Sequence, residues 1–224
     1  MKGNKPKVAF FDFCETIVDF QTADAFVDYV REKRQSGVME KKELVRKYLL
    51  KTKIIRFLEI LIGSSFSINK RMKLNQLKGI SENEVKKYAI DYYQEIVKPR
   101  FIPAIISRLS KLQAEGWSVV LVSGGYDVYL NEFAREFGIV KVISSIIGFD
   151  RGICTGRMKG LDCLRSNKIV LLQQFYAKEE IKSVSFSDSS SDIPLLSWTN
   201  KGYVVSHLKH QDWVDKFNFK EIIW

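Results

Sequence analysis

Three short apolar segments of this 224-residue chain each end at a residue that can take part in catalysis. Asp12 follows VAFF, Ser123 follows VVLV and Asp188 follows VSFS. Unalternating runs rich in Val and Phe are typical of strands buried on both faces of a parallel sheet. Ligands of such sheets bind outside the carboxyl ends of the strands, where the strand order reverses. We therefore expect Asp12, Ser123 and Asp188 to face one crevice.

Together these residue types suit phosphoryl transfer. Asp12 provides a carboxylate nucleophile, and Ser123 is followed by two glycines whose backbone N–H groups can face an anion. Asp188 and Asp192 begin and end the segment DSSSD and provide carboxylates for a hard cation. Lys168, near the start of the helical pattern before that segment, supplies a fixed positive charge for the phosphate.

The elements that must position these residues can be predicted from the hydrophobic pattern. Helical patterns follow the apolar runs, and two further strands are predicted after Ser123. The helices cover residues 106–116, 128–138 and 167–180, and the further strands cover 140–150 and 202–205. Alternating strands and helices predict an α/β fold, a Rossmann-like doubly wound parallel sheet with helices on both faces.

Residues 19–98 interrupt this alternation. Their helical patterns cover residues 22–34, 41–63 and 82–97, and we find no convincing strand among them. We predict an α/β core domain of residues 1–18 and 99–224, with an all-helical domain of residues 19–98 inserted after the first strand.

The order of the motifs strongly resembles that of the haloacid dehalogenase (HAD) superfamily of aspartate-nucleophile phosphatases. The motifs are DxxxT from Asp12, VSGG around Ser123, Lys168, and DSSSD from Asp188. Residues 148–175 look like the phosphoserine-phosphatase-like branch, subfamily IB, and the whole resemblance covers about residues 7–30 and 100–205. It implies that the inserted helices form a C1-type cap. The implied function is a Mg²⁺-dependent phosphatase that acts on a small phosphorylated metabolite.

The resemblance also implies roles for the nucleophile and for the metal site. Asp12 would attack phosphorus and form an aspartyl-phosphate. Mg²⁺ would be bound by Asp12, Asp188 and the backbone carbonyl of Cys14, and Asp192 would support the metal or Lys168. A cation is needed because a carboxylate that attacks a phosphate dianion is otherwise repelled.

The implied phosphate contacts come from the second and third motifs. Ser123 and the amide of Gly124 would hold the phosphoryl oxygens, and Lys168 would neutralise both the nucleophile and the phosphate. We prefer Lys168 over the nearby Lys159 because its spacing to the apolar helix resembles the family pattern.

Cys14 departs from the family pattern. Phosphatases of this family have an acid/base Asp two residues after the nucleophile, which protonates the leaving group and activates water. Such help is typically worth about 10²–10⁴-fold in rate. Cys14 is thus consistent with a substrate that has a good leaving group, with a slow phosphatase, or with a catalytically impaired relative that has a binding or regulatory role.

Composition limits the remaining classes of function. A chain with 46% hydrophobic residues and four prolines is neither disordered nor collagen-like. Three cysteines without CxxC spacing argue against a disulfide scaffold, and we expect a cytoplasmic protein without a membrane span. The sequence does not indicate an oligomeric state.

The net charge of +10 is concentrated in the predicted insertion. Residues 19–100 contain 18 Lys and Arg against 11 Asp and Glu. Because these basic residues are interleaved with apolar ones and no nucleic-acid motif is present, we expect no nucleic-acid partner. A basic lid over a phosphate site would instead raise the local concentration of an anionic small substrate.

Overall fold

The computed structural model describes residues 5–34 and 68–224, and the predicted helix at 41–63 lies outside them. The strands are β1 (Lys7–Phe11), β2 (Ser118–Tyr126), β3 (Lys141–Asp150), β4 (Ile153–Lys159), β5 (Lys182–Ser187), β6 (Lys201–Ser206) and β7 (Lys220–Ile223). The α-helices are α1 (Thr22–Arg34), α4 (Ile68–Leu74), α5 (Glu82–Tyr92), α6 (Pro103–Ala114), α7 (Asp127–Glu136), α8 (Asn167–Leu172), α9 (Ile193–Trp198) and α10 (Trp213–Lys216). Shorter helical turns are η1 (Asn75–Leu77), η2 (Tyr93–Val97), η3 (Lys98–Arg100), η4 (Lys178–Glu180) and η5 (Ser190–Asp192).

The strands form one seven-stranded sheet in the order β4-β3-β2-β1-β5-β6-β7. All neighbours are parallel except β3 and β4, which form an antiparallel hairpin. The chain moves from β1 through β2 to β3 on one side, and from β5 through β6 to β7 on the other. The strand order therefore reverses at β1 and β5, where Asp12 and Asp188 follow the strands. This confirms the predicted α/β sheet, although β4 and β7 were not predicted.

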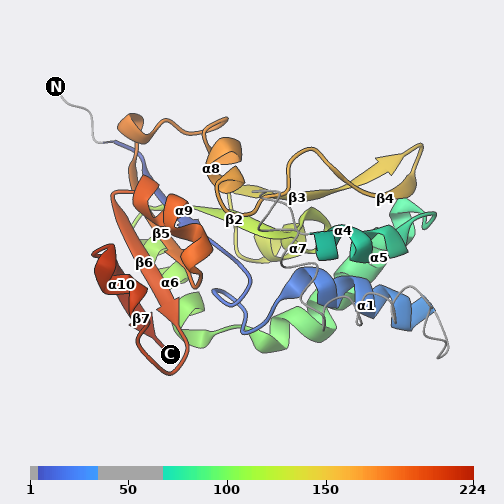
Figure 1. The fold of residues 1–224 in the computed structure, drawn as a ribbon, viewed down its shortest axis with the longest axis horizontal. Coiled ribbons are helices and arrows are strands. Elements are labelled where there is room, and N and C mark those ends of the chain that lie inside the picture. The colour runs from blue at the N-terminus through green and yellow to red at the C-terminus, as the bar shows by residue number, and fades with distance from the viewer. Residues whose placement is uncertain (1–4, 35–67) are drawn as a thin grey trace.

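Alternate residues of β1 are buried on opposite faces of the sheet. Ala9 and Phe11 belong to a hydrophobic cluster that includes residues of α6 and α7, and the Phe11 ring stacks on Phe186 of β5. Val8 and Phe10 belong to a second cluster with residues of α8 and α9. Figure 1 shows helices covering the two faces of the sheet. A strand covered on both faces has no solvent side, which explains the unbroken apolar run.

Helix α8 is shorter than the pattern at 167–180 predicts. The helix ends at Leu172, and the amides of Gln174 and Phe175 then bond three residues back, to Leu171 and Leu172. The Tyr176 ring packs edge-on against Phe10, with 5.3 Å between the centroids. This contact holds the chain after Leu172 against the sheet, and the chain therefore leaves the helix at this point.

The β3–β4 hairpin extends beyond the sheet and contacts the inserted segment (Figure 1). The amide of Gly79 donates to the Cys154 carbonyl at 2.9 Å, and the amide of Cys154 donates to the Ile80 carbonyl at 2.8 Å. The amide of Glu82 donates to the Gly152 carbonyl at 2.8 Å. Residues outside the predicted 19–98 insertion therefore help to hold it in place.

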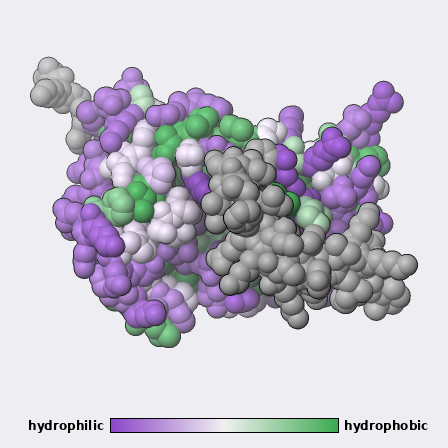
Figure 2. Space-filling view, in the orientation of Figure 1, coloured by the Kyte–Doolittle hydropathy of each residue, from purple (hydrophilic) through white to green (hydrophobic). Residues whose placement is uncertain are grey.

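The described surface is largely hydrophilic in the view of Figure 2, with apolar side chains in small separate groups. The described helices are short, and α1 has 13 residues. Within residues 5–34 and 68–224, no helix combines the length and the apolar composition that crossing a bilayer requires.

Gly156 of β4 packs closely against residues of the predicted insertion. A Cβ atom at this position would lie 2.9 Å from Lys78 Cβ and 3.0 Å from Asn75 Cα. Its φ of +69° also disfavours any side chain. Gly160 has a similar φ of +79° but nothing within 4 Å of its Cβ position, so it is a matched control.

We predict that Gly156→Ala lowers the free energy of unfolding by about 1–3 kcal/mol more than Gly160→Ala does. Both variants place alanine in a left-handed backbone conformation, which is strained. Only Gly156→Ala adds steric overlap with the insertion. Urea unfolding of the two variants measures the difference. Equal losses would show that the hairpin does not press on the insertion.

Candidate active site

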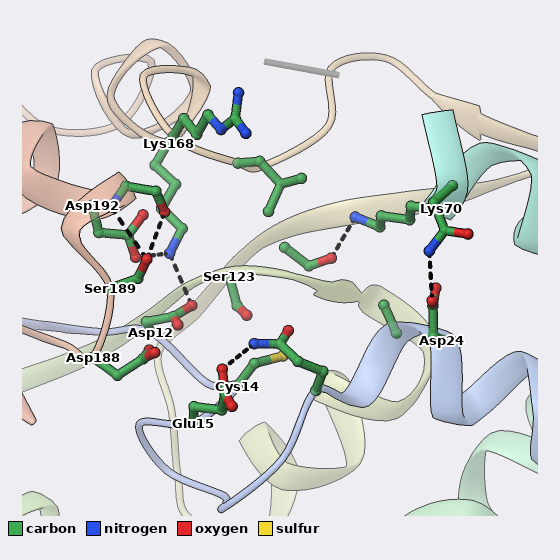
Figure 3. Close-up of a pocket in the computed structure, with 17 residues that line it drawn as sticks. Asp12, Cys14, Glu15, Asp24, Lys70, Ser123, Lys168, Asp188, Ser189 and Asp192 are labelled. Atoms are coloured by element: carbon green, nitrogen blue, oxygen red, sulfur yellow. Dashed lines mark hydrogen bonds and ion pairs between the residues drawn. The ribbon is translucent and has the colours of Figure 1, made fainter. Parts of the chain in front are cut away.

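A cavity of about 370 Å³ lies at the carboxyl ends of β1, β2 and β5. All of the residues predicted for the site line it, and they come from four separate parts of the chain. The lining residues are Asp12, Cys14, Glu15, Gln21, Ala23, Asp24, Asn69, Lys70, Ser123, Gly124, Leu164, Arg165, Lys168, Asp188, Ser189, Ser191 and Asp192. Figure 3 shows these side chains around one space.

The turn after β1 directs Asp12 and Cys14 into the cavity. The amide of Asp12 donates to the Phe186 carbonyl at 2.9 Å, which ties the end of β1 to β5. The amide of Ile17 donates to the Phe13 carbonyl at 2.8 Å, and Glu15 adopts a φ of +53° to close the turn. A left-handed non-glycine residue is strained, and such strain persists where the surrounding structure enforces it.

Lys168 lies between two carboxylates at the base of the cavity. Its Nζ donates to Asp12 Oδ1 at 2.9 Å and also pairs with Asp192, and all three side chains are buried. Burial raises the pKa of Asp12, while the charge of Lys168 lowers it and limits that rise. Burial lowers the pKa of the Lys168 ammonium, but the two carboxylates outweigh this effect and raise it above its ordinary value. Lys168 is therefore a permanent cation beside the candidate nucleophile.

Asp192 contacts Lys168 directly, which favours its role as the support of that lysine. The hydroxyl of Ser187, the last residue of β5, donates to Asp192 Oδ2 at 2.6 Å. The same carboxylate oxygen pairs with Lys168. Metal binding by Asp192 stays a prediction.

Asp188 and Asp12 provide two carboxylates on one cavity. Thr16, from the DxxxT motif, donates its hydroxyl to Asp188 Oδ1 at 3.0 Å and accepts from the Asp188 amide at 3.0 Å. Burial, followed by the charge of Asp12, raises the pKa of Asp188 to about 8. Two desolvated carboxylates that repel each other fit a hard divalent cation such as Mg²⁺, which would remove the repulsion. Among the described residues, no group of three His, Cys, Asp or Glu side chains has the geometry of a metal site, so the fit rests on this pair.

The Cys14 thiol belongs to a chain of polar groups. Its Sγ lies 3.0 Å from Thr22 Oγ1, which lies 2.7 Å from the Tyr129 hydroxyl. Burial and the charge of Asp12 raise the pKa of Cys14 to about 11. The thiol is therefore protonated at neutral pH. Neither Thr22 nor Tyr129 was predicted, because each stands within a helical pattern without any other mark of function.

Ser123, Gly124 and Gly125 form an irregular end to β2. The β2–β3 register shifts between Ser123 and Tyr126, and the Gly125 amide donates to Ser123 Oγ at 3.2 Å. A Cβ atom at Gly124 would lie 2.3 Å from the end of the Leu164 side chain, so any larger residue there requires Leu164 to move. This arrangement is consistent with phosphate contacts from Ser123 and Gly124.

Four residues of α1 and α4 also line the cavity, and none of them was predicted as a site residue. Ala23 and Asp24 come from α1, and Asn69 and Lys70 come from α4. Asn69 Nδ2 donates to Asp24 Oδ2 at 3.0 Å (Figure 3). Lys70 is one of 18 basic residues between positions 19 and 100, and nothing in its neighbourhood of the sequence distinguishes it.

Comparison with known proteins finds a phosphatase of similar sequence. The chain is 24% identical over 197 residues to a phosphoserine phosphatase of Albidiferax ferrireducens, a match that covers 85% of this chain and 74% of the relative.

Two solved structures share the fold. A protein of unknown function from Bordetella pertussis Tohama I has a TM-score of 0.78 and 18% identity, covering 98% of this chain and 99% of that one. A phospho-aspartyl intermediate analogue of phosphoserine phosphatase has a TM-score of 0.58 and 19% identity, covering 98% and 94%. The profile of the haloacid dehalogenase-like hydrolases matches residues 9–197. The chain thus belongs to the haloacid dehalogenase-like hydrolase family, in its phosphoserine-phosphatase-like branch.

Proposed function

We propose that this protein is a Mg²⁺-dependent phosphatase that hydrolyses the monoester of a small phosphorylated metabolite through an aspartyl-phosphate on Asp12. The observation that carries the proposal is the position of Lys168 between Asp12 and Asp192, with Asp188 on the same cavity. The phosphoserine phosphatase relative and the phospho-aspartyl analogue of similar fold support this chemistry.

In the first step an Asp12 carboxylate oxygen attacks phosphorus, and the bond from phosphorus to the leaving oxygen breaks. Lys168 stays charged throughout and balances the negative charge that gathers on Asp12 and the phosphoryl group. The Ser123 hydroxyl and the Gly124 amide hold phosphoryl oxygens. Bound Mg²⁺, held by Asp12, Asp188 and the Cys14 carbonyl, would supply further positive charge at the phosphate. In the second step water hydrolyses the aspartyl-phosphate and releases phosphate.

Residues 19–98, whose described helices include α1, α4 and α5, act in this proposal as a cap. Side chains of α1 and α4 line the cavity together with Leu164 and Arg165 of the core. A cavity of about 370 Å³ suits a small substrate rather than a polymer. The cap excludes water during attack and contacts the organic part of the substrate, to which the phosphate is attached.

Cys14 determines which leaving groups the site handles well. The thiol is protonated, but a pKa near 11 makes it a weaker acid than a carboxyl group. Protonation of a poor leaving group in the transition state is therefore weak, and esters of acidic alcohols or phenols are the favoured substrates. The same observation supports a second candidate, a catalytically impaired relative that binds a phosphorylated ligand.

The first test compares variants of Asp12 and Cys14 on an aryl and an alkyl phosphate. Asp12→Asn should abolish turnover of both, because the nucleophile is lost. Cys14→Asp should raise turnover of the alkyl phosphate by about 10²–10⁴-fold, because a carboxyl group then protonates the leaving oxygen. Cys14→Ser is the matched control and should give no gain. If wild type and Asp12→Asn are equally inert and Cys14→Asp recovers nothing, the phosphatase proposal fails.

The second test concerns the metal. Removing Mg²⁺ with a chelator should abolish turnover, and adding it back should restore the rate. Thermal unfolding should show stabilisation of the wild type by Mg²⁺, about 2–3 kcal/mol at 100 times the dissociation constant. Asp188→Asn should lose this stabilisation, since one of the two carboxylates is gone. Equal stabilisation of both proteins would place the metal elsewhere.

The third test measures the Cys14 thiol itself. Burial and the nearby Asp12 charge raise the pKa of Cys14 to about 11. Below that pH, a smaller fraction of Cys14 is thiolate than in a free cysteine. In a Cys154→Ser/Cys163→Ser variant at pH 8, Cys14 should react with a disulfide reagent about 10²-fold more slowly than a free thiol. The same variant in guanidinium chloride is the control and should react at the free rate. Fast reaction of the folded variant would mean that the thiol is not held neutral.

A further inference from the structure

Lys70 of α4 crosses from the inserted segment into the core and is 6% exposed. Its Nζ donates to the Gly124 carbonyl at 2.5 Å, to Ser145 Oγ at 2.8 Å and to Asp162 Oδ1 at 2.5 Å. It also lies 5.2 Å from the centroid of the Tyr126 ring. A lysine loses solvation and conformational freedom when it is buried, and its hydrogen-bond partners must offset that cost. The role of Lys70 is therefore read from these partners.

The contact of Lys70 with Gly124 is linked through one peptide group to the hydroxyl of Ser123, the predicted phosphate ligand. The Gly124 carbonyl and the Gly125 amide belong to the same trans peptide and point in opposite directions. Lys70 holds the carbonyl, and the amide donates to Ser123 Oγ at 3.2 Å. Because Ser123 accepts this bond, its own hydrogen can point to an oxygen in the cavity. Within the described residues, Gly125 is the one hydrogen-bond partner of that hydroxyl.

The contact of Lys70 with Asp162 links it to the segment that precedes Lys168. Ser145 donates to Asp162 Oδ1 at 2.5 Å and accepts from the Cys163 amide at 3.1 Å. Asn167, which precedes Lys168, donates its side-chain amide to the Asp162 carbonyl at 3.0 Å. Lys70 therefore connects to both segments that surround the predicted phosphate position.

We propose that Lys70 is a positioning residue of the phosphate site, which orients the Gly124–Gly125 peptide and through it the Ser123 hydroxyl toward the phosphoryl group. The inference rests on the proposed phosphatase function and adds a residue of the inserted segment to it. Placing the α4 helix correctly then completes the phosphate site. The site gains affinity for an oxyanion only while Lys70 reaches Gly124.

Lys73 provides a matched control on the same helix. It is 1% exposed and pairs with Asp28 of α1, so it too is a buried lysine in an ion pair. It does not line the cavity, and its pair joins two helices of the inserted segment. A general loss of stability should follow from either substitution, while a loss of oxyanion binding should follow only from substitution of Lys70.

The experiment measures binding of tungstate, an unreactive phosphate mimic, by calorimetry in the presence of Mg²⁺. Lys70→Met/Asp162→Asn removes both charges of the pair, so the net charge near the site is unchanged and no buried carboxylate is left alone. This variant should bind tungstate about tenfold more weakly than wild type. Lys73→Met should bind within about twofold of wild type.

A second comparison in a Ser123→Ala background tests the route of the effect. If Lys70 acts through the Ser123 hydroxyl, adding Lys70→Met/Asp162→Asn to Ser123→Ala should weaken binding less than about twofold further. A full tenfold loss in that background overturns the proposal, and so does unchanged binding of tungstate by Lys70→Met/Asp162→Asn. Failure of the wild type to bind tungstate overturns the proposed phosphatase site itself, which is a separate result.

Discussion

The buried contact of Lys168 with Asp12 and Asp192 is the interaction on which the site depends. A carboxylate at the end of a buried strand is costly to desolvate, and a neighbouring ammonium group offsets that cost. The sheet makes the contact possible, because β1 and β5 are adjacent where the strand order reverses, and Asp12 and Asp192 follow those strands. Since one lysine pairs with two carboxylates, the cluster favours ligands that bring positive charge to the remaining carboxylate, Asp188.

The described part of residues 19–98, the predicted insertion, is bonded to the rest of the protein at several points. Lys70 contacts Gly124 and Asp162, and the β3–β4 hairpin bonds to residues 79–82. Basic residues of this segment that the structure describes are often paired with acids, as in Lys33–Glu95 and Arg34–Glu84. Part of the basic residues is thus paired locally although the net excess of positive charge remains, and Lys70 is set apart by its burial against the core.

Cys14 illustrates how surroundings change the chemistry of one position. Its thiol lies against Thr22 and Tyr129 and close to the charge of Asp12, so burial and repulsion both favour the protonated form. A carboxyl group here would be ionised more readily and would exchange a proton with substrate and water. In the proposed mechanism, the departure at this single residue therefore concerns the proton-transfer step and leaves the proposed nucleophile Asp12 and its contact with Lys168 in place.

The sequence by itself determined the α/β class of the fold and the strand ends at which the candidate site residues lie. Unbroken apolar runs mark strands buried on both faces, and Asp12, Ser123 and Asp188 follow from them because parallel strands end at one edge. The strands β4 and β7 escaped prediction because their residues are half-exposed and pair only at the two edges of the sheet. Only the tertiary structure decided that Lys70 and Asp162, 92 positions apart, meet beside Gly124. The physical reason is that a lysine buried away from water needs an acidic or polar partner within the protein. The local sequence around Lys70 does not specify which distant residue that partner is.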